Sequence, residues 1–84
     1  MLALPHVTGT ECILALRRLG FRAQRRAGGL VTLGRGHSNV IVPEAATLGP
    51  AVVGAILRAA GVDPLQFVVA FEEEAASAAR ENVA

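Results

Sequence analysis

Residues 21–43 read FRAQRRAGGLVTLGRGHSNVIVP, and this stretch decides the fold. Apolar and polar residues alternate at its start, as in a half-buried strand, and two short apolar runs follow. A Gly-Gly pair and a Gly-Arg-Gly-His segment separate the runs, and such segments form tight turns. We therefore predict an antiparallel meander of three strands. The expected strands are residues 21–25, 30–33 and 38–42.

The residues before the meander predict a helix from about Gly9 to Leu19. Thr8 and Glu11 have the spacing of a capping box, in which each side chain bonds the other residue's backbone N–H. Gly20 follows the last turn, where a glycine commonly adopts the left-handed conformation that ends a helix.

Two further helices are predicted after the meander. The segment from Thr47 to Pro50 opens the first, with the proline in the first turn, and Gly61 ends it. Asp63 caps the second, which continues to about Asn82. The residues expected to be buried are Leu48, Val52, Ala55, Ile56 and Ala59 in the first of these helices and Leu65, Val68 and Val69 in the second.

The predicted order α-β-β-β-α-α defines an α+β domain in which helices cover one face of a three-stranded antiparallel sheet. We expect one domain over residues 1–84, with its body at about 8–71 and an acidic helical tail at 72–84. The other face of the sheet stays open, as antiparallel sheets permit. Functional residues are expected on that open face.

The charge of the chain is unevenly distributed, although the net charge is only +1. Residues 1–60 contain seven Arg and two Glu, whereas residues 61–84 contain one Arg and five acidic residues. Every basic residue is Arg, whose planar guanidinium suits bidentate contacts with phosphate. A polyanionic partner accounts for this pattern, and a genome-wide preference for Arg is the alternative.

The composition argues against several other classes of protein. An apolar content of 52% is too high for a disordered chain. No apolar run approaches the roughly 20 residues that cross a bilayer, and the first residues lack the pattern of a signal peptide. Cys12 is the only cysteine, so we expect a small core residue in a reducing compartment, with the cytoplasm as the expected location.

Four short segments, in their order and spacing, resemble the HicA-type toxins. They are residues 16–21 (LRRLGF), 40–43 (VIVP), 47–62 (TLGP, then ILRAAGV) and 63–67 (DPLQF). The resemblance covers about residues 8–71 and implies a fold like that of a double-stranded-RNA-binding domain. It also implies a cofactor-free endonuclease of mRNA and a partner antitoxin of the HicB type.

The chain departs from the family at its signature, Gly-Ser-His at the start of the second strand. Gly28 keeps its place, but Gly29 stands where the serine is expected and Leu30 where the catalytic histidine is expected. Histidine can remove the 2′-OH proton because it titrates near neutral pH, whereas leucine cannot exchange protons. The resemblance therefore implies RNA binding without nuclease activity. His37, on the turn before the third strand, is the alternative catalytic group.

The arginines of the first strand are candidate RNA contacts. By strand alternation, Arg22, Gln24 and Arg26 share one face, where they would hold successive phosphates; an ordinary solvated face is the alternative. The two glycines that follow are a candidate phosphate nest or simply a hairpin turn. The candidate RNA-binding residues are Arg22, Gln24, Arg25, Arg26, Gly28 and Gly29.

Leu30 and the acidic tail each allow two interpretations. On the open face, Leu30 suits a protein partner, either a HicB-type antitoxin or a second copy in a homodimer. A one-residue register shift would bury it instead. Glu72, Glu73 and Glu74 point in different directions on a helix, so they predict no metal site. They form a solvated face, or the tail folds over the arginines and competes with RNA.

Three functions therefore follow from the sequence. The first is a HicA-like RNA-binding domain of a toxin–antitoxin-type system that lacks nuclease activity. The second is a protein-interaction or dimerisation module that uses the open face around Leu30. The third is an active mRNA endoribonuclease that uses His37. No cofactor, metal or membrane partner is expected.

Overall fold

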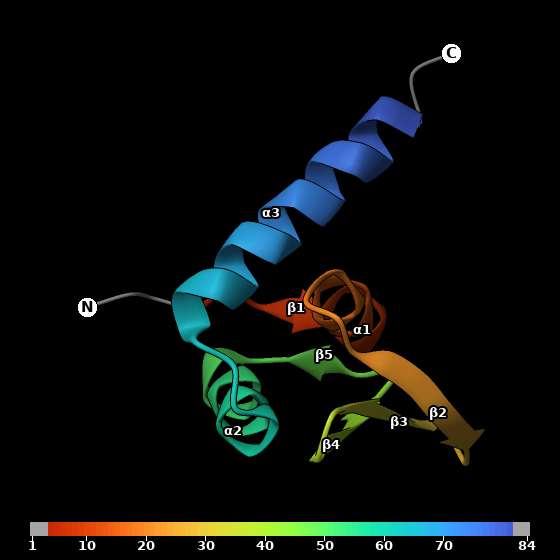
Figure 1. Ribbon diagram of the computed structural model, residues 1–84. Coiled ribbons are helices and arrows are strands. Elements are labelled where there is room, and N and C mark those ends of the chain that lie inside the picture. The colour runs from red at the N-terminus through yellow and green to blue at the C-terminus, as the bar shows by residue number, and fades with distance from the viewer. Residues whose placement is uncertain (1–3, 82–84) are drawn as a thin grey trace.

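The computed structural model describes residues 4–81 (Figure 1). The central antiparallel sheet has the strand order β2-β3-β4, and two very short strands, β1 and β5, pair separately. The predicted α+β class and the predicted order of helices and central strands are confirmed. The elements are β1 (Val7–Thr8), α1 (Gly9–Arg18), β2 (Arg22–Ala27), β3 (Leu30–Arg35), β4 (Ser38–Pro43), β5 (Thr47–Leu48), α2 (Pro50–Ala60) and α3 (Pro64–Glu81).

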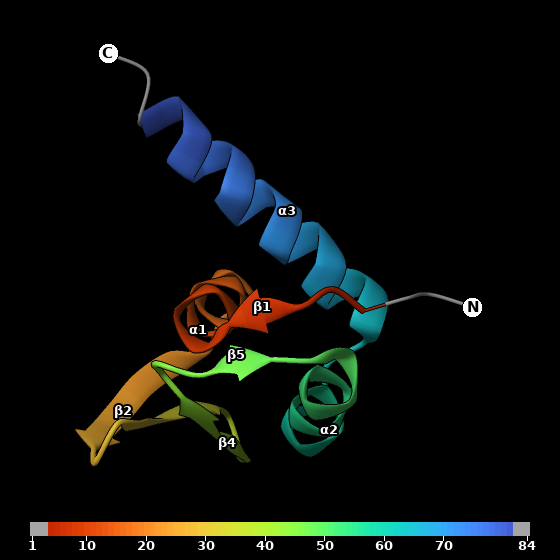
Figure 2. The same ribbon diagram turned by 180° about the vertical axis from the view of Figure 1, so that it is seen from behind.

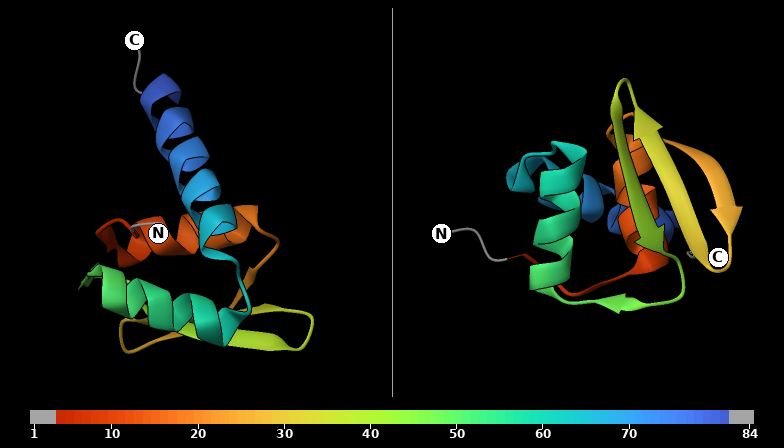
Figure 3. Two further views of the ribbon diagram at one scale, coloured as in Figure 1. Left: turned by 90° about the vertical axis from the view of Figure 1, so that its left-hand side faces the viewer. Right: turned by 90° about the horizontal axis from the view of Figure 1, so that it is seen from below.

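The central sheet is buried on one face. Val31 and Leu33 of β3 are buried, and so are their partners in β4, Val42 and Val40. Successive side chains of a strand point to opposite faces. Thr32 in β3 and Ile41 in β4 therefore point away from the core. Figure 2 shows the sheet and the β1–β5 pair from behind, and Figure 3 shows α1 across one face of the sheet and α2 beside its β4 edge.

α1 begins where the capping box predicts. The backbone N–H of Glu11 donates to Thr8 Oγ1 at 3.1 Å, and the backbone N–H of Thr8 donates to Glu11 Oε1 at 2.8 Å. Gly9 donates its N–H to Ala46 O at 2.8 Å, and a Cβ at Gly9 would overlap Pro43 O. Glycine therefore lets the first turn of α1 lie directly against the end of β4.

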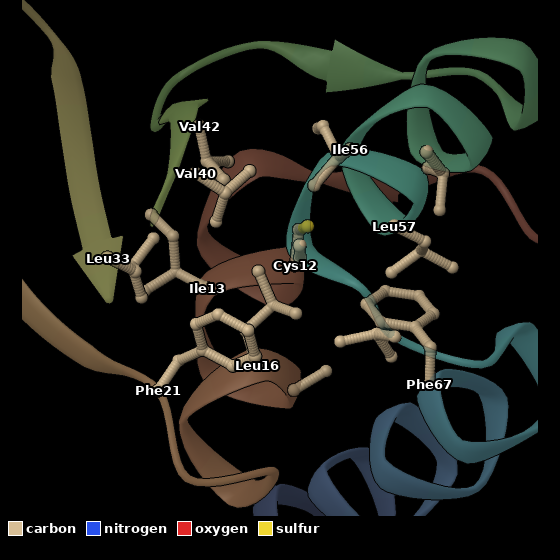
Figure 4. Packing of buried hydrophobic residues seen from close by; sticks show 14 of the residues in the cluster. Cys12, Ile13, Leu16, Phe21, Leu33, Val40, Val42, Ile56, Leu57 and Phe67 are labelled. Carbon is tan, nitrogen blue, oxygen red and sulfur yellow. The ribbon is translucent and has the colours of Figure 1, made fainter. Parts of the chain in front are cut away.

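The core lies between the inner face of the sheet and the three helices (Figure 4). Leu16 of α1, Leu57 of α2 and Phe67 of α3 are all fully buried in it. Cys12 is also buried, as predicted, and this burial raises the pKa of its thiol to about 11 because desolvation disfavours the thiolate. The thiol is therefore protonated and unreactive at neutral pH.

The segment before α2 differs from the prediction. Thr47 and Leu48 form β5, which pairs with Val7 and Thr8 of β1, so the helix begins only at Pro50. The predicted buried face of α2 is also wrong in part, because this helix is apolar on nearly every side and two faces satisfy the periodicity. The buried residues of α2 are Val53, Ile56, Leu57 and Ala60, whereas Val52, Ala55 and Ala59 are exposed.

α3 packs its first half against the body of the protein and projects its second half away from the sheet (Figures 1 and 3). Phe67 and Ala70 are buried, whereas Leu65 and Val69, which were predicted to be buried, are exposed. The helix continues through residues 72–81, as predicted for the tail. The predicted end near Asn82 lies outside the described residues.

Between residues 4 and 81, no single helix is long and apolar enough to cross a membrane. The pair α2 and α3 meets that test when the two helices are taken together, but they are bent by 111° at the break between them.

Candidate functional site on the open face of the sheet

The face of the sheet that points away from α1 is called the open face here. Its side chains form three rows across β2, β3 and β4, because residues paired across strands share a face. The rows are Arg22–Gly34–Asn39, Arg25–Thr32–Ile41 and Ala27–Leu30–Pro43. Polar and basic groups thus occupy the β2 side and the end near Asn39, and apolar groups occupy the opposite corner.

A β-bulge at Gln24 changes which arginines reach this face. The pairing of β2 with β3 shifts between Ala23 and Arg25, so Gln24 is an extra residue in β2. The prediction that Arg22, Gln24 and Arg26 share one face is therefore wrong for Arg26. That arginine is paired with Val31 of the core face, and its Nη2 lies 2.9 Å from Glu44 Oε2.

Leu30 lies on the open face with 46% of its surface exposed, so its alternative placement in the core is excluded. Ile41, in the next row, is 56% exposed. The two residues line a shallow hollow of about 170 Å³ together with Arg25, Ala27 and Thr32. This corner of the face is apolar, and no side chain that titrates near neutral pH lines the hollow.

A larger groove of about 580 Å³ runs between the open face and α2. Gln24, Thr32 and Asn39 line it from the sheet, and Val52, Ala55 and Ala59 line it from α2. Val40, Ile41 and Ile56 complete the lining. The exposed side of α2, predicted to be buried, therefore forms one wall of this groove. The groove and the Leu30 hollow share Thr32 and Ile41, so they form one continuous surface.

The arginines divide into engaged and unengaged groups. Arg18 pairs with Glu74, and Arg26 pairs with Glu44. Arg35 donates from Nη1 to Leu19 O at 2.8 Å, and its Cζ lies 4.6 Å from the centre of the Phe21 ring. Arginines that make no ion pair and no side-chain hydrogen bond within the described residues are called unengaged. They are Arg17, Arg22, Arg25, Arg58 and Arg80.

Two of these unengaged arginines, Arg17 and Arg22, meet at the corner where α1 joins β2. They line a hollow of about 420 Å³ with Gly20, Phe21 and Ala23. Arg25 adds a further positive group along β2. The positive surface therefore begins at the end of α1 and follows the outer strand of the sheet.

The acidic tail does not cover this surface. Glu74 pairs with Arg18 on α1, and α3 runs away from β2 (Figure 1). The hypothesis that the acidic tail folds over the arginines of β2 is therefore wrong for residues 72–81, and residues 82–84 lie outside the described part of the chain. Over the part of the chain that the structure describes, no three His, Cys, Asp or Glu side chains are grouped to hold a metal ion.

His37 and Leu30 lie at opposite ends of β3. Leu30 is the first of the six residues of β3, and His37 belongs to the turn after its last residue. At about 3.3 Å per residue, β3 separates the two by roughly 17 Å. His37 therefore cannot supply the imidazole that is missing at the Leu30 position, and a catalytic role at its own end of the sheet stays a prediction.

The hairpin turn before Leu30 accounts for the presence of Gly28 and Gly29, and no bound ligand is needed to explain them. Gly28 and Gly29 have φ angles of +60° and +78°, which a two-residue hairpin turn of type I′ requires. A Cβ on either residue would meet nothing within 4 Å, so this turn is open to solvent. Turn geometry is sufficient here, and the phosphate nest stays a prediction.

The fold and this face define an α+β domain with an open sheet surface, basic along its outer strand and apolar beside α2. No family model, curated protein or solved structure gives a significant match to this chain.

Proposed function

We propose that this protein is a HicA-like RNA-binding domain of a toxin–antitoxin-type system and that it does not cleave the RNA it binds. The observation that carries the proposal is the position of Arg22 and Arg25, two unengaged arginines in neighbouring rows of one face. Strand geometry separates such rows by about 7 Å. Two guanidinium groups at this spacing suit successive phosphates of one strand.

The electrostatics of the face support a polyanion as the partner. No Asp or Glu within residues 4–81 lines the groove beside α2 or the hollow at Leu30. Glu44 is paired with Arg26, and no acidic side chain of the described residues pairs with Arg22 or Arg25. Arg17 at the end of α1 extends the positive surface by one more group.

The absence of cleavage rests on Leu30. The resemblance to HicA-type toxins assigns the general base to this position, and Leu30 has an aliphatic side chain among Ala27, Ile41 and Pro43. A general base contributes about 10²–10⁴-fold to such a reaction, so its loss removes most of the rate.

Salt-dependent binding of a labelled RNA tests the proposal. Fluorescence anisotropy of the wild type should give an affinity that falls steeply as salt rises, because each phosphate contact releases counterions. In Arg22→Ala/Arg25→Ala, the affinity should fall at every salt concentration. The slope of log K against log salt should also become shallower by about 1 to 2.

Arg80→Ala is the control variant, because it removes one exposed arginine at the far end of α3, away from β2. Its affinity should stay within about 2-fold of the wild type, since exposed charges act weakly beyond a Debye length of about 8–10 Å. Equal losses in the two variants, or no RNA binding by the wild type, would contradict the proposal.

A second candidate function, protein docking, is favoured by the apolar corner of the same face. Leu30, Ile41 and Val52 are each about half exposed, and exposed apolar groups that adjoin one another mark interaction surfaces. The partner would be a HicB-type antitoxin or a second copy of the chain. Sedimentation of the protein over a range of concentrations tests self-association, which Leu30→Asp should then abolish.

A further inference from the structure

Two carboxamide groups converge above a bare stretch of backbone on the open face. Gly34 lies between Arg22 and Asn39 in the first row, with Gln24 in the bulge beside it. A Cβ at Gly34 would collide with Gln24 Nε2 and would lie 2.7 Å from Asn39 Oδ1. The two side chains therefore occupy the space that any residue larger than glycine would fill.

These carboxamides form the polar wall of the groove beside α2. Each carries a donor and an acceptor side by side, the pattern that hydrogen-bonds the edge of a nucleobase. The opposite wall is apolar, with Val52, Ala55 and Ala59 of α2. The groove thus offers hydrogen bonds on one side and an aliphatic surface on the other, which matches the edge and the flat face of a base.

The charges around the groove indicate that the ligand carries negative charge beside its base. Arg22 stands in the row of Asn39, and Arg25 stands in the row of Ile41, so both arginines lie across the sheet from the groove. No acidic residue among the described ones lines it. A ligand with its base in the groove would place its backbone phosphates over β2.

We propose that this groove receives an unpaired base of single-stranded RNA. The RNA backbone runs along β2 at Arg22 and Arg25. The carboxamides of Gln24 and Asn39 hydrogen-bond the edge of the base, and Ile41 and Val52 contact its flat face. This inference rests on the proposed RNA binding and narrows its substrate to single strands. A base in a duplex is stacked and paired, so it cannot enter the groove.

The test compares a labelled RNA of about 12 nucleotides, within the usual site size of single-strand-binding domains, with the duplex of the same sequence. The wild type should bind the single strand about 10-fold more tightly than the duplex, because only an unpaired base can reach the two carboxamides and the aliphatic wall of the groove. Anisotropy at one fixed salt concentration measures both affinities.

Ala59→Leu fills the groove without changing charge, and leucine suits an exposed helical position. It should lower the affinity for the single strand by about 10-fold and leave that for the duplex unchanged. Ala51→Leu is the matched control, since Ala51 is exposed on the same helix and does not line the groove. Circular dichroism should show both variants folded like the wild type.

The outcomes separate this inference from the function on which it rests. Equal binding of single strand and duplex, with no effect of Ala59→Leu, would overturn the groove assignment while RNA binding stands. Absence of any RNA binding by the wild type would overturn both. A concentration-dependent oligomer that Ala59→Leu disrupts, without a change in RNA affinity, would assign the groove to a protein partner and overturn the inference.

Discussion

The guanidinium of Arg35 covers the ring of Phe21, with Cζ 4.6 Å from the ring centre, and donates from Nη1 to Leu19 O at 2.8 Å. It thereby bonds a carbonyl at the C-terminal end of α1, where backbone acceptors have no helical partner and positive charge is favourable. This arginine of β3 links the end of α1 to the sheet.

Arg35→Ala should therefore lower the free energy of unfolding by about 1–2 kcal/mol, from the lost hydrogen bond and the lost cation–π contact. Urea unfolding followed by circular dichroism measures this change. Arg58→Ala, which removes an exposed arginine with no ion pair among the described residues, should change it by less than about 0.5 kcal/mol. A similar effect of both substitutions would show that Arg35 acts only through its charge.

Gly34 and Gly9 should respond very differently to alanine. At Gly34 the atoms nearest to the added Cβ belong to the ends of two flexible side chains, Gln24 and Asn39, and these ends can move aside. Gly34→Ala should cost about 1 kcal/mol or less and selectively weaken single-stranded RNA binding. At Gly9 the added Cβ overlaps the backbone oxygen of Pro43 and lies 2.6 Å from that of Glu44.

Gly9→Ala should therefore destabilise the protein by about 3 kcal/mol or more, since backbone must move. Thermal unfolding of the two variants measures the contrast. Equal melting temperatures would contradict the close approach of α1 to β4.

Cys12 should make the protein unstable in alkali. The chain has no Tyr and no Lys, so Cys12 is the only side chain expected to titrate between about pH 8 and 12. Its pKa is about 11 in the folded protein and near 9.0 otherwise. The folded state thus holds the thiol proton more tightly, and this contribution is present below about pH 9 and is lost as pH rises through about 11.

Two pKa units correspond to about 2–3 kcal/mol. The free energy of unfolding should therefore fall by about that amount between pH 8 and pH 11. In Cys12→Ala the pH dependence should disappear, although the variant itself is less stable because a buried sulfur is lost. Urea unfolding at a series of pH values tests this, and an unchanged slope in the variant would assign the effect elsewhere.

RNA should remain intact in the presence of the protein. After prolonged incubation at a concentration that saturates binding, a denaturing gel should show no more cleavage than buffer alone. The chain has two histidines, His6 and His37, and replacing either with Ala should leave this result unchanged. Cleavage by the wild type that His37→Ala removes and His6→Ala does not would establish the endoribonuclease alternative.

The sequence predicts most of the fold because its local signals are strong. The capping box at Thr8 and Glu11 predicts the start of α1, and the glycine turns separate the three strands of the central sheet. The two-residue pairing of β1 with β5 has no such signal, because Val7 and Leu48 become neighbours only through the fold.

The open face was predicted only in part, for two physical reasons. α2 is apolar on nearly every side, so periodicity alone does not distinguish the side that contains Val53 from the side that contains Val52. Contact with β4 and α3 decides between them. No glycine or proline marks the bulge at Gln24, so simple alternation places Arg26 on the open face. In the structure, Arg25 lies on that face instead.

That bulge also makes β2 tolerant of a change in length. Gln24 and Arg25 together stand opposite the single residue Thr32. The pairing of β2 with β3 is therefore regular on both sides of the bulge. Deleting Gln24 would take one amide from the surface and leave Arg22 and Ala27 facing as they do now. A deletion at this position would alter what the surface recognises without turning the strand over.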